Sequence, residues 1–121
     1  MSFTPISLTL AVQDMHAIGS VENLGSTVLS GDVQAWALGT FGAPTDPVSA
    51  GYFAASQGSF RMTYPFNEQA TVVQGSVKLT DVTSGESRSY GVGDSWFVTK
   101  GTEVIWEIDS PLFMKHYFAA V

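Results

Sequence analysis

The sequence contains no cysteine, and it is poor in basic residues and in long apolar runs. Without cysteine there are no disulfides and no thiol chemistry, which fits a reducing compartment. Five Lys and Arg stand against eleven Asp and Glu, for a net charge of −6. A surface of that sign repels phosphate backbones, so nucleic acid is not an expected partner.

No stretch approaches the roughly 20 consecutive apolar residues that a membrane helix requires. Residues 1–14 lack the basic start of a secretory signal, and their apolar part, bounded by Pro5 and by Gln13-Asp14, is too short and polar for one. These absences predict a soluble, cytoplasmic protein with no membrane partner.

The residues that are present favour a single domain rich in strands. Of the 121 residues, 45% are hydrophobic and only 13% are charged, which is enough apolar surface for a sizeable core. Twelve glycines and five prolines indicate many tight turns. The expected fold is therefore built from short strands, and no internal repeat or low-complexity tract is visible.

Alternating apolar and polar residues locate several strands. Val77 and Leu79 share one face of a segment at 76–82, and Val104, Trp106 and Ile108 share one face of a segment at 103–108. Residues 14–20 are interpreted as one helical turn or a loop, and residues 1–30 show little pattern. Strands are predicted at 33–39, 49–56, 59–64, 70–73, 76–82, 87–90, 95–98, 103–108 and 113–119. This spacing predicts an all-β sandwich or barrel, and periodicity does not decide between the two.

Two glycine-anchored blocks carry a family resemblance. In the first, Gly58 is followed by Glu68 and, six intervening residues later, by Gly75. In the second, Gly93-Asp94 is followed by Gly101. The spacing resembles the two motifs of the cupin barrel, and the likeness covers about residues 33–120.

One cupin branch resembles the chain more closely. Short cupins similar to the ethanolamine-utilisation Q-type protein and the ureidoglycine aminohydrolase domain share its Lys100-Gly101, Trp106 and Lys115-His-Tyr117. The resemblance implies an all-β fold, a single cupin jelly-roll β-barrel over residues 33–121. Residues 1–32 are expected to form an N-terminal arm of the same domain. It also implies a homodimer.

The metal-binding histidines of most cupins are replaced in this sequence. The resemblance aligns them with Tyr64, Phe66 and Val104, and only Glu68 remains of the usual ligand set. A stable divalent site needs three or four side-chain ligands, and His116 alternates away from the face of its strand neighbours. We expect no metal and no other cofactor.

Glu68 and Lys115 are the candidate catalytic residues. The cupin frame turns Glu68 inward, where a carboxylate requires a partner, and Lys115 on the last strand is the candidate partner. They would serve as an acid/base pair or as an anchor for an anionic ligand. The alternatives are a solvated Glu68 at a strand end and a Lys115 that extends to the surface.

Tyr64, Trp106 and Tyr117 are the candidate ligand-binding residues, because aromatic side chains commonly form pocket walls. Plain core packing is the alternative for each. The expected function is binding of a small molecule in a barrel without the usual metal site. One alternative is an enzyme acting on a small amine, ureide or carboxylate metabolite, and another is a filled barrel with a structural role.

Overall fold

A computed structural model describes residues 2–121. Nine strands and two short 3-10 helices make up its regular structure, and no cis peptide bond occurs in the described part of the chain. The elements are η1 (Val12–Asp14), β1 (His16–Ser20), η2 (Val21–Leu24), β2 (Thr27–Ser30), β3 (Gln34–Phe41), β4 (Val48–Thr63), β5 (Asn67–Gln74), β6 (Val77–Asp81), β7 (Ser87–Tyr90), β8 (Ser95–Val98) and β9 (Glu103–Ala120). The predicted all-β fold is confirmed.

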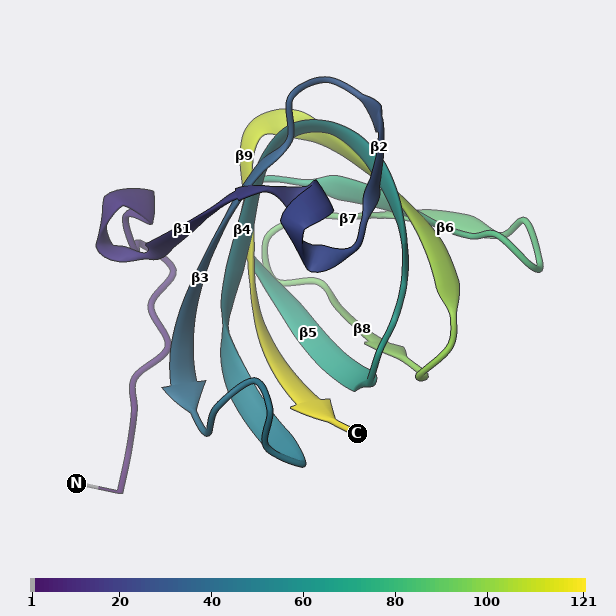
Figure 1. The fold of residues 1–121 in the computed structure, drawn as a ribbon. Coiled ribbons are helices and arrows are strands. Elements are labelled where there is room, and N and C mark those ends of the chain that lie inside the picture. Colours follow the sequence, from purple (N-terminus) through teal and green to yellow (C-terminus); the bar gives the residue numbers. More distant parts are fainter. Residues whose placement is uncertain (1) are drawn as a thin grey trace.

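Two long antiparallel strands, β4 and β9, run side by side through both walls of the barrel (Figure 1). We call residues 48–56 of β4 and residues 112–120 of β9 the outer halves of these strands. The outer halves form one wall together with β1, β3, β5 and β8, which we call the β8 wall. We call residues 58–63 of β4 and residues 103–108 of β9 the inner halves. The inner halves form the second wall, the β7 wall, together with β2, β6 and β7. The two walls enclose the core as a jelly-roll barrel.

The corner between the walls lies where the register of β4 and β9 shifts. Only Gln57 of β4 stands between the paired residues Ser56 and Gly58, whereas 109–111 intervene on β9. Gly58 has a φ of 146°, and a Cβ there would lie 2.6 Å from a methyl of Val33. Glycine at this position therefore lets Val33, the residue before β3, approach the bend closely.

The structure joins segments that the sequence pattern separates. The predicted strands at 49–56 and 59–64 are one strand, β4, and those at 103–108 and 113–119 are one strand, β9. Residues 109–111 were expected to end a strand, but they bend it instead. The chain continues through them because Ser110 accepts a hydrogen bond from the backbone N–H of Ser76 and donates one to the carbonyl of Leu112.

The N-terminal third is more ordered than its sequence suggests. The prediction of a helical turn or loop at 14–20 is wrong for most of that range, because β1 pairs with β3 there. Further on, β2 pairs with the inner half of β4. Both strands are short and irregular in register, and both carry mixed apolar and polar residues, which explains why alternation did not reveal them.

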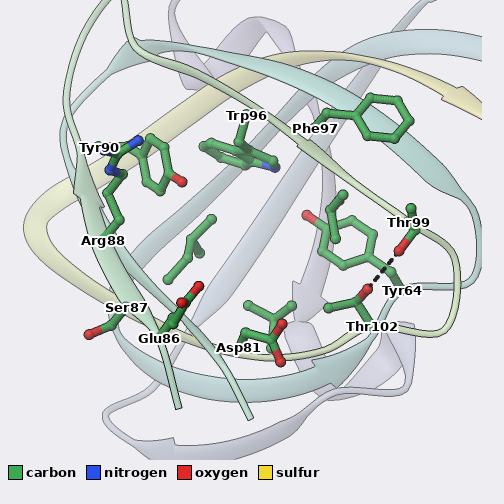
Figure 2. A pocket seen from close by; sticks show the side chains of 13 residues that line it. Tyr64, Asp81, Glu86, Ser87, Arg88, Tyr90, Trp96, Phe97, Thr99 and Thr102 are labelled. Carbon is green, nitrogen blue, oxygen red and sulfur yellow. Dashed lines mark hydrogen bonds between the residues drawn. The ribbon is translucent and has the colours of Figure 1, made fainter. Parts of the chain in front are cut away.

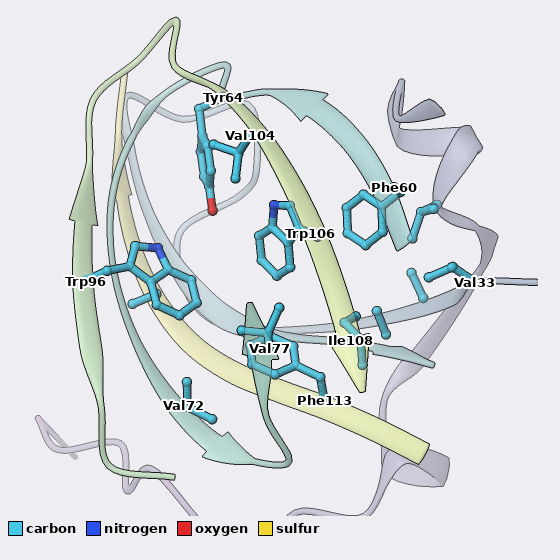
Figure 3. Close-up of a cluster of buried hydrophobic side chains, with 14 residues drawn as sticks. Val33, Phe60, Tyr64, Val72, Val77, Trp96, Val104, Trp106, Ile108 and Phe113 are labelled. Atoms are coloured by element: carbon cyan, nitrogen blue, oxygen red, sulfur yellow. The ribbon is translucent and has the colours of Figure 1, made fainter. Parts of the chain in front are cut away.

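Two clusters of buried side chains hold the fold together. The larger lies between the walls (Figure 3) and consists of Val21, Val33, Ala35, Ala55, Phe60, Tyr64, Ala70, Val72, Val77, Trp96, Val104, Trp106, Ile108 and Phe113. The smaller lies on the outer face of the β8 wall, where Met15, Leu10 and Val12 of the N-terminal segment cover Tyr52 and Met114. The N-terminal segment thus closes one part of that face.

Within residues 2–121, no helix has the length and apolar character that a membrane crossing requires.

Candidate functional site

A pocket opens where two edge strands face each other. In the described sheet β7 pairs only with β6, and β8 pairs only with β5, so the barrel wall is open between them. The cavity there has a volume of about 770 Å³, within the usual range for small-molecule sites. Its lining, drawn in Figure 2, is Tyr64, Leu79, Asp81, Glu86, Ser87, Arg88, Tyr90, Trp96, Phe97, Val98, Thr99, Thr102 and Val104.

The β6–β7 hairpin supplies the charged rim of this pocket. Leu79 is paired with Arg88, and since facing residues of antiparallel strands point to the same side, Arg88 points with Leu79 toward the pocket. Asp81 accepts hydrogen bonds from the backbone N–H groups of Thr83 and Ser84, which fixes the turn of the hairpin. The rim therefore carries two carboxylates, Asp81 and Glu86, and one guanidinium.

Beneath the pocket floor lies a buried ion pair. Lys115 of β9 donates to Oε1 of Glu68 at 2.6 Å, and the Tyr64 hydroxyl donates to Oε2 at 2.7 Å. Glu68 is 1% exposed and Lys115 4% exposed. Both oxygens of the carboxylate are engaged, so the Glu68 charge is paired and hydrogen-bonded inside an apolar core.

Five aromatic rings surround the Lys115 ammonium. The centroids of Phe53, Tyr64, Trp96, Trp106 and Tyr117 lie between 5.0 and 5.7 Å from Nζ. Phe53 reaches this position because it is the direct partner of Lys115 across β4 and β9. Ring faces attract a cation and exclude water, so the cage supplements Glu68 in stabilising the charge.

Burial and the Glu68 carboxylate shift the ionisation of the neighbouring groups. Burial lowers the pKa of Lys115, and the charge of Glu68 opposes that shift. The pKa of Tyr64 is raised well above its usual value, first by burial and then by the charge and hydrogen bond of Glu68. Burial and the same charge also raise the pKa of Tyr117. Both phenols therefore remain protonated donors at neutral pH.

Two further donors in this region have no partner within residues 2–121. The indole Nε1 atoms of Trp96 and Trp106 are buried and make no hydrogen bond of normal geometry there, although the Trp96 N–H lies close enough to the Tyr64 hydroxyl to lower the pKa of that phenol slightly against the larger effects of burial and Glu68. Figure 3 shows both nitrogens on the sides of their rings nearest the Tyr64 hydroxyl. The two ring centroids are 6.0 Å apart. Such donors are costly to leave unpaired in a low-dielectric interior.

The structure brings the predicted site residues together, although most lie behind the pocket. The predicted partnership of Glu68 and Lys115 is present, and a surface position for Lys115 is wrong. Tyr64 lines the pocket, whereas Glu68, Lys115 and Trp106 do not. Tyr117 is half-buried beside Phe66, and its ring joins the cage around Lys115.

Sequence reasoning missed the residues of the rim as site candidates. Arg88 and Tyr90 alternate along β7 and so share one face, and Glu86 directly precedes the strand, which was a usable signal. What the sequence did not supply was the direction of that face, since it depends on β7 being an edge strand opposite β8. Trp96 of β8 also forms part of the pocket wall.

The donor set of the site does not fit a divalent metal. Within residues 2–121, no three His, Asp or Glu side chains gather in a ligand arrangement. Glu68 already has Lys115 and Tyr64 on its two oxygens. The His116 ring pairs instead with the Thr40 hydroxyl at 2.9 Å and contacts Tyr52 edge-on, on the opposite face of β9 from Lys115.

Known structures share the fold. The EutQ protein of Clostridium difficile superposes with a TM-score of 0.62 at 17% identity, covering 73% of this chain and 68% of its own. A protein of unknown function from Pseudomonas syringae pv. tomato gives 0.76 at 16% identity, covering 95% of this chain; this chain spans 46% of its length. One from Rhizobium leguminosarum gives 0.60 at 17% identity, covering 97% and 98%.

At these identities the structural likeness concerns the fold and not the activity. No functionally curated protein matches the sequence. Residues 42–117, most of the barrel including the pocket and the buried trio, match the family of EutQ-like cupin domains. The chain belongs to the EutQ-like cupin domain family.

Proposed function

We propose that this protein binds a small molecule in the pocket between β7 and β8. One observation carries the proposal: the cavity is open to solvent, and the buried hydrogen bonds of Glu68 with Lys115 and Tyr64 lie directly behind its floor. Tyr64 belongs to both, since its ring lines the pocket and its hydroxyl holds Glu68. A molecule contacting Tyr64 and Trp96 therefore meets the outer surface of the Glu68–Lys115 pair.

The position of the pair favours binding over catalysis. Glu68 and Lys115 are almost without solvent exposure and are hydrogen-bonded to each other, so a molecule in the pocket reaches them only through Tyr64 and Trp96. Apolar and aromatic walls with a few polar groups are typical of ligand sites. Glu68 and Lys115 accordingly serve as a fixed support that orients the Tyr64 ring.

One observation favours the enzyme hypothesis as a second candidate. A carboxylate that shares hydrogen bonds with a phenol and an ammonium, both of shifted pKa, is an arrangement suited to proton transfer. In that case Glu68 and Lys115 act as the acid/base pair on a small amine, ureide or carboxylate, and turnover requires Glu68.

A thermal-shift screen against small amines, ureides and carboxylates tests the binding proposal. A ligand at 100 times its Kd stabilises the fold by about 2.7 kcal/mol. The variant Arg88→Trp fills the mouth of the pocket, and Ser89→Trp is its control, because the next residue of β7 points away from the cavity. We expect the shift to vanish in Arg88→Trp and to persist in Ser89→Trp.

Three outcomes separate the hypotheses. Binding without turnover supports the binding protein, and turnover lost in Glu68→Gln supports the enzyme. If no compound stabilises the chain, or if Arg88→Trp keeps the shift, the pocket has no binding role and the filled barrel is favoured.

We also propose that two copies of the chain associate through the uncovered part of the β8 wall. Phe97, Phe118 and Phe41 are exposed there. Phe97 and Phe118 are both partners of Gln69 across the sheet, so they lie on one outer face. The N-terminal segment covers the other part of the face, and a second copy would cover this one.

Light scattering on the purified chain tests this association. We expect a dimer that dissociates in Phe118→Lys, with the pocket variant Arg88→Trp as the control that remains dimeric. A monodisperse monomer of the unaltered chain would refute it.

A further inference from the structure

The interior of the barrel beneath the pocket contains buried hydrogen-bond donors that are not paired with an acceptor. An indole N–H can only donate, and those of Trp96 and Trp106 have no partner within the described residues. Lys115 carries three N–H bonds, of which one goes to Glu68. The acceptors of this region are the Glu68 oxygens, which already serve Lys115 and Tyr64, and the Tyr64 hydroxyl oxygen, to which neither indole N–H makes a hydrogen bond of normal geometry.

The rings that carry these indole donors lie around the Lys115 ammonium. The ring centroids of Trp96 and Trp106 lie 5.7 and 5.0 Å from Lys115 Nζ. Trp96 is 8% exposed and Trp106 2% exposed, so both indoles are more than nine-tenths buried. Trp96 also forms part of the pocket wall, which puts this donor group next to the cavity.

We infer that the ligand carries a carboxylate, which accepts hydrogen bonds from the indole N–H of Trp96 and, further in, from Trp106 and Lys115. This inference rests on the proposed binding function and specifies the chemistry of its ligand. A carboxylate has about four acceptor positions and no donor, which is the complement of the donor set described above. Charge-assisted hydrogen bonds of this kind are also the stronger ones.

The rim carries more negative than positive side chains and so favours a cationic ligand. The strength of this preference has to be compared with that of the buried donors, which favour an anion. Asp81 and Glu86 would attract an amine, and Arg88 would attract an anion. Glu86 and Arg88 are exposed, and interactions of such groups are screened by water and salt. The indoles act where water is excluded, and an unpaired donor there is costly, so the interior decides the ligand class.

Because neither indole nitrogen is open to solvent, the carboxylate reaches them only if side chains at the floor move. Tyr64 and Trp96 are the two side chains that line both the cavity and the cage, and of these Trp96 carries the indole donor. Binding should therefore change the environment of the indole N–H groups directly, which supplies a measurement independent of any activity.

Nuclear magnetic resonance of the three indole N–H groups in the full chain tests the inference. Trp36 is the internal control, because it packs on the outer face of the β8 wall and not in the barrel. Acetate and butyrate are the probes, and butylamine is the matched cation. We expect both carboxylates to move the Trp96 and Trp106 proton resonances downfield in a saturable way, while Trp36 stays in place and butylamine has no effect.

Two variants sharpen the test. Trp96→Phe keeps a ring and removes the donor, and it should raise the Kd for butyrate about tenfold, as expected for one lost hydrogen bond to a charged acceptor. Trp36→Phe should leave the Kd unchanged.

The inference is overturned if butylamine moves the barrel indoles and the carboxylates do not, or if all three indoles shift together without saturation. Another outcome would refute this inference alone and leave the binding function in place. In that outcome, a compound without a carboxylate binds the unaltered protein but not Arg88→Trp, and no carboxylate moves the resonance of Trp96 or Trp106. If nothing binds at all, both fail.

Discussion

Removing Lys115 from the buried trio is expected to destabilise the barrel strongly. In Lys115→Met, a side chain of similar length and no charge occupies the cage, and Glu68 keeps only the Tyr64 hydroxyl as its partner. The carboxylate, 1% exposed, would then be a buried charge without a counter-charge. Its neighbours are aromatic rings, whose faces repel an anion.

The magnitude follows from the distance and the burial. Two unit charges 2.6 Å apart attract by roughly 6 kcal/mol at an effective dielectric constant of about 20. Desolvation of both ions offsets much of that attraction, and breaking a buried pair by removing one partner costs about 3–5 kcal/mol. For a domain of this size such a loss lowers Tm by on the order of 10–20 °C.

Urea unfolding followed by circular dichroism measures the effect. Lys78→Met is the matched control, because Lys78 and Glu107 form an exposed pair 3.9 Å apart whose loss should cost about 0.5 kcal/mol or less. The double variant Glu68→Gln, Lys115→Met leaves no isolated charge and should be more stable than Lys115→Met alone. If Lys115→Met and Lys78→Met cost the same, the interior is hydrated and the reasoning fails.

Three further outcomes are expected. Tyr64→Phe leaves Glu68 without one charge-assisted hydrogen bond and should cost about 1.5–3 kcal/mol in urea unfolding; an unchanged midpoint would contradict the hydrogen bond. Gly75→Ala should destabilise far more than Gly85→Ala, because both have positive φ but only at Gly75 would the Cβ collide with the Leu112 carbonyl, and calorimetry decides between them. Burial lowers the pKa of His116 below its ordinary 6.5, so the unfolded chain binds the proton first and stability falls as pH decreases below about 6.5; the part of that slope due to His116 should be missing in His116→Gln.

The strand content was predictable wherever alternation met a clear turn. Val77 and Leu79 point inward as their spacing indicated, and so do Val104, Trp106 and Ile108. The bend at 109–111 was not predictable, because proline and serine there carry the same signal as a strand end. Whether such a segment breaks or bends a strand depends on the partner, and here Gln57 of β4 sits opposite it.

For the candidate site, the sequence indicated that Glu68 and Lys115 are partners, but not how deeply they are buried. Glu68 and Lys115 were expected to meet because an inward carboxylate needs a counter-charge. That they lie under the floor rather than in the cavity depends on Phe53, Trp96 and Trp106 filling the space around Nζ. These three residues come from three different strands, so no local sequence pattern predicts the cage.

The double role of β9 has a consequence for how the chain folds. Its inner half is the partner of β6, its outer half is the partner of β5, and both halves pair with β4. Until β9 has been synthesised, β5 and β6 each lack one of the strands with which they pair in the folded barrel. The contacts that complete both walls therefore join distant parts of the sequence, and such contacts form slowly. During synthesis, β4, β5 and β6 would wait with unpaired edges exposed, a state prone to aggregation, until one strand closes both walls together.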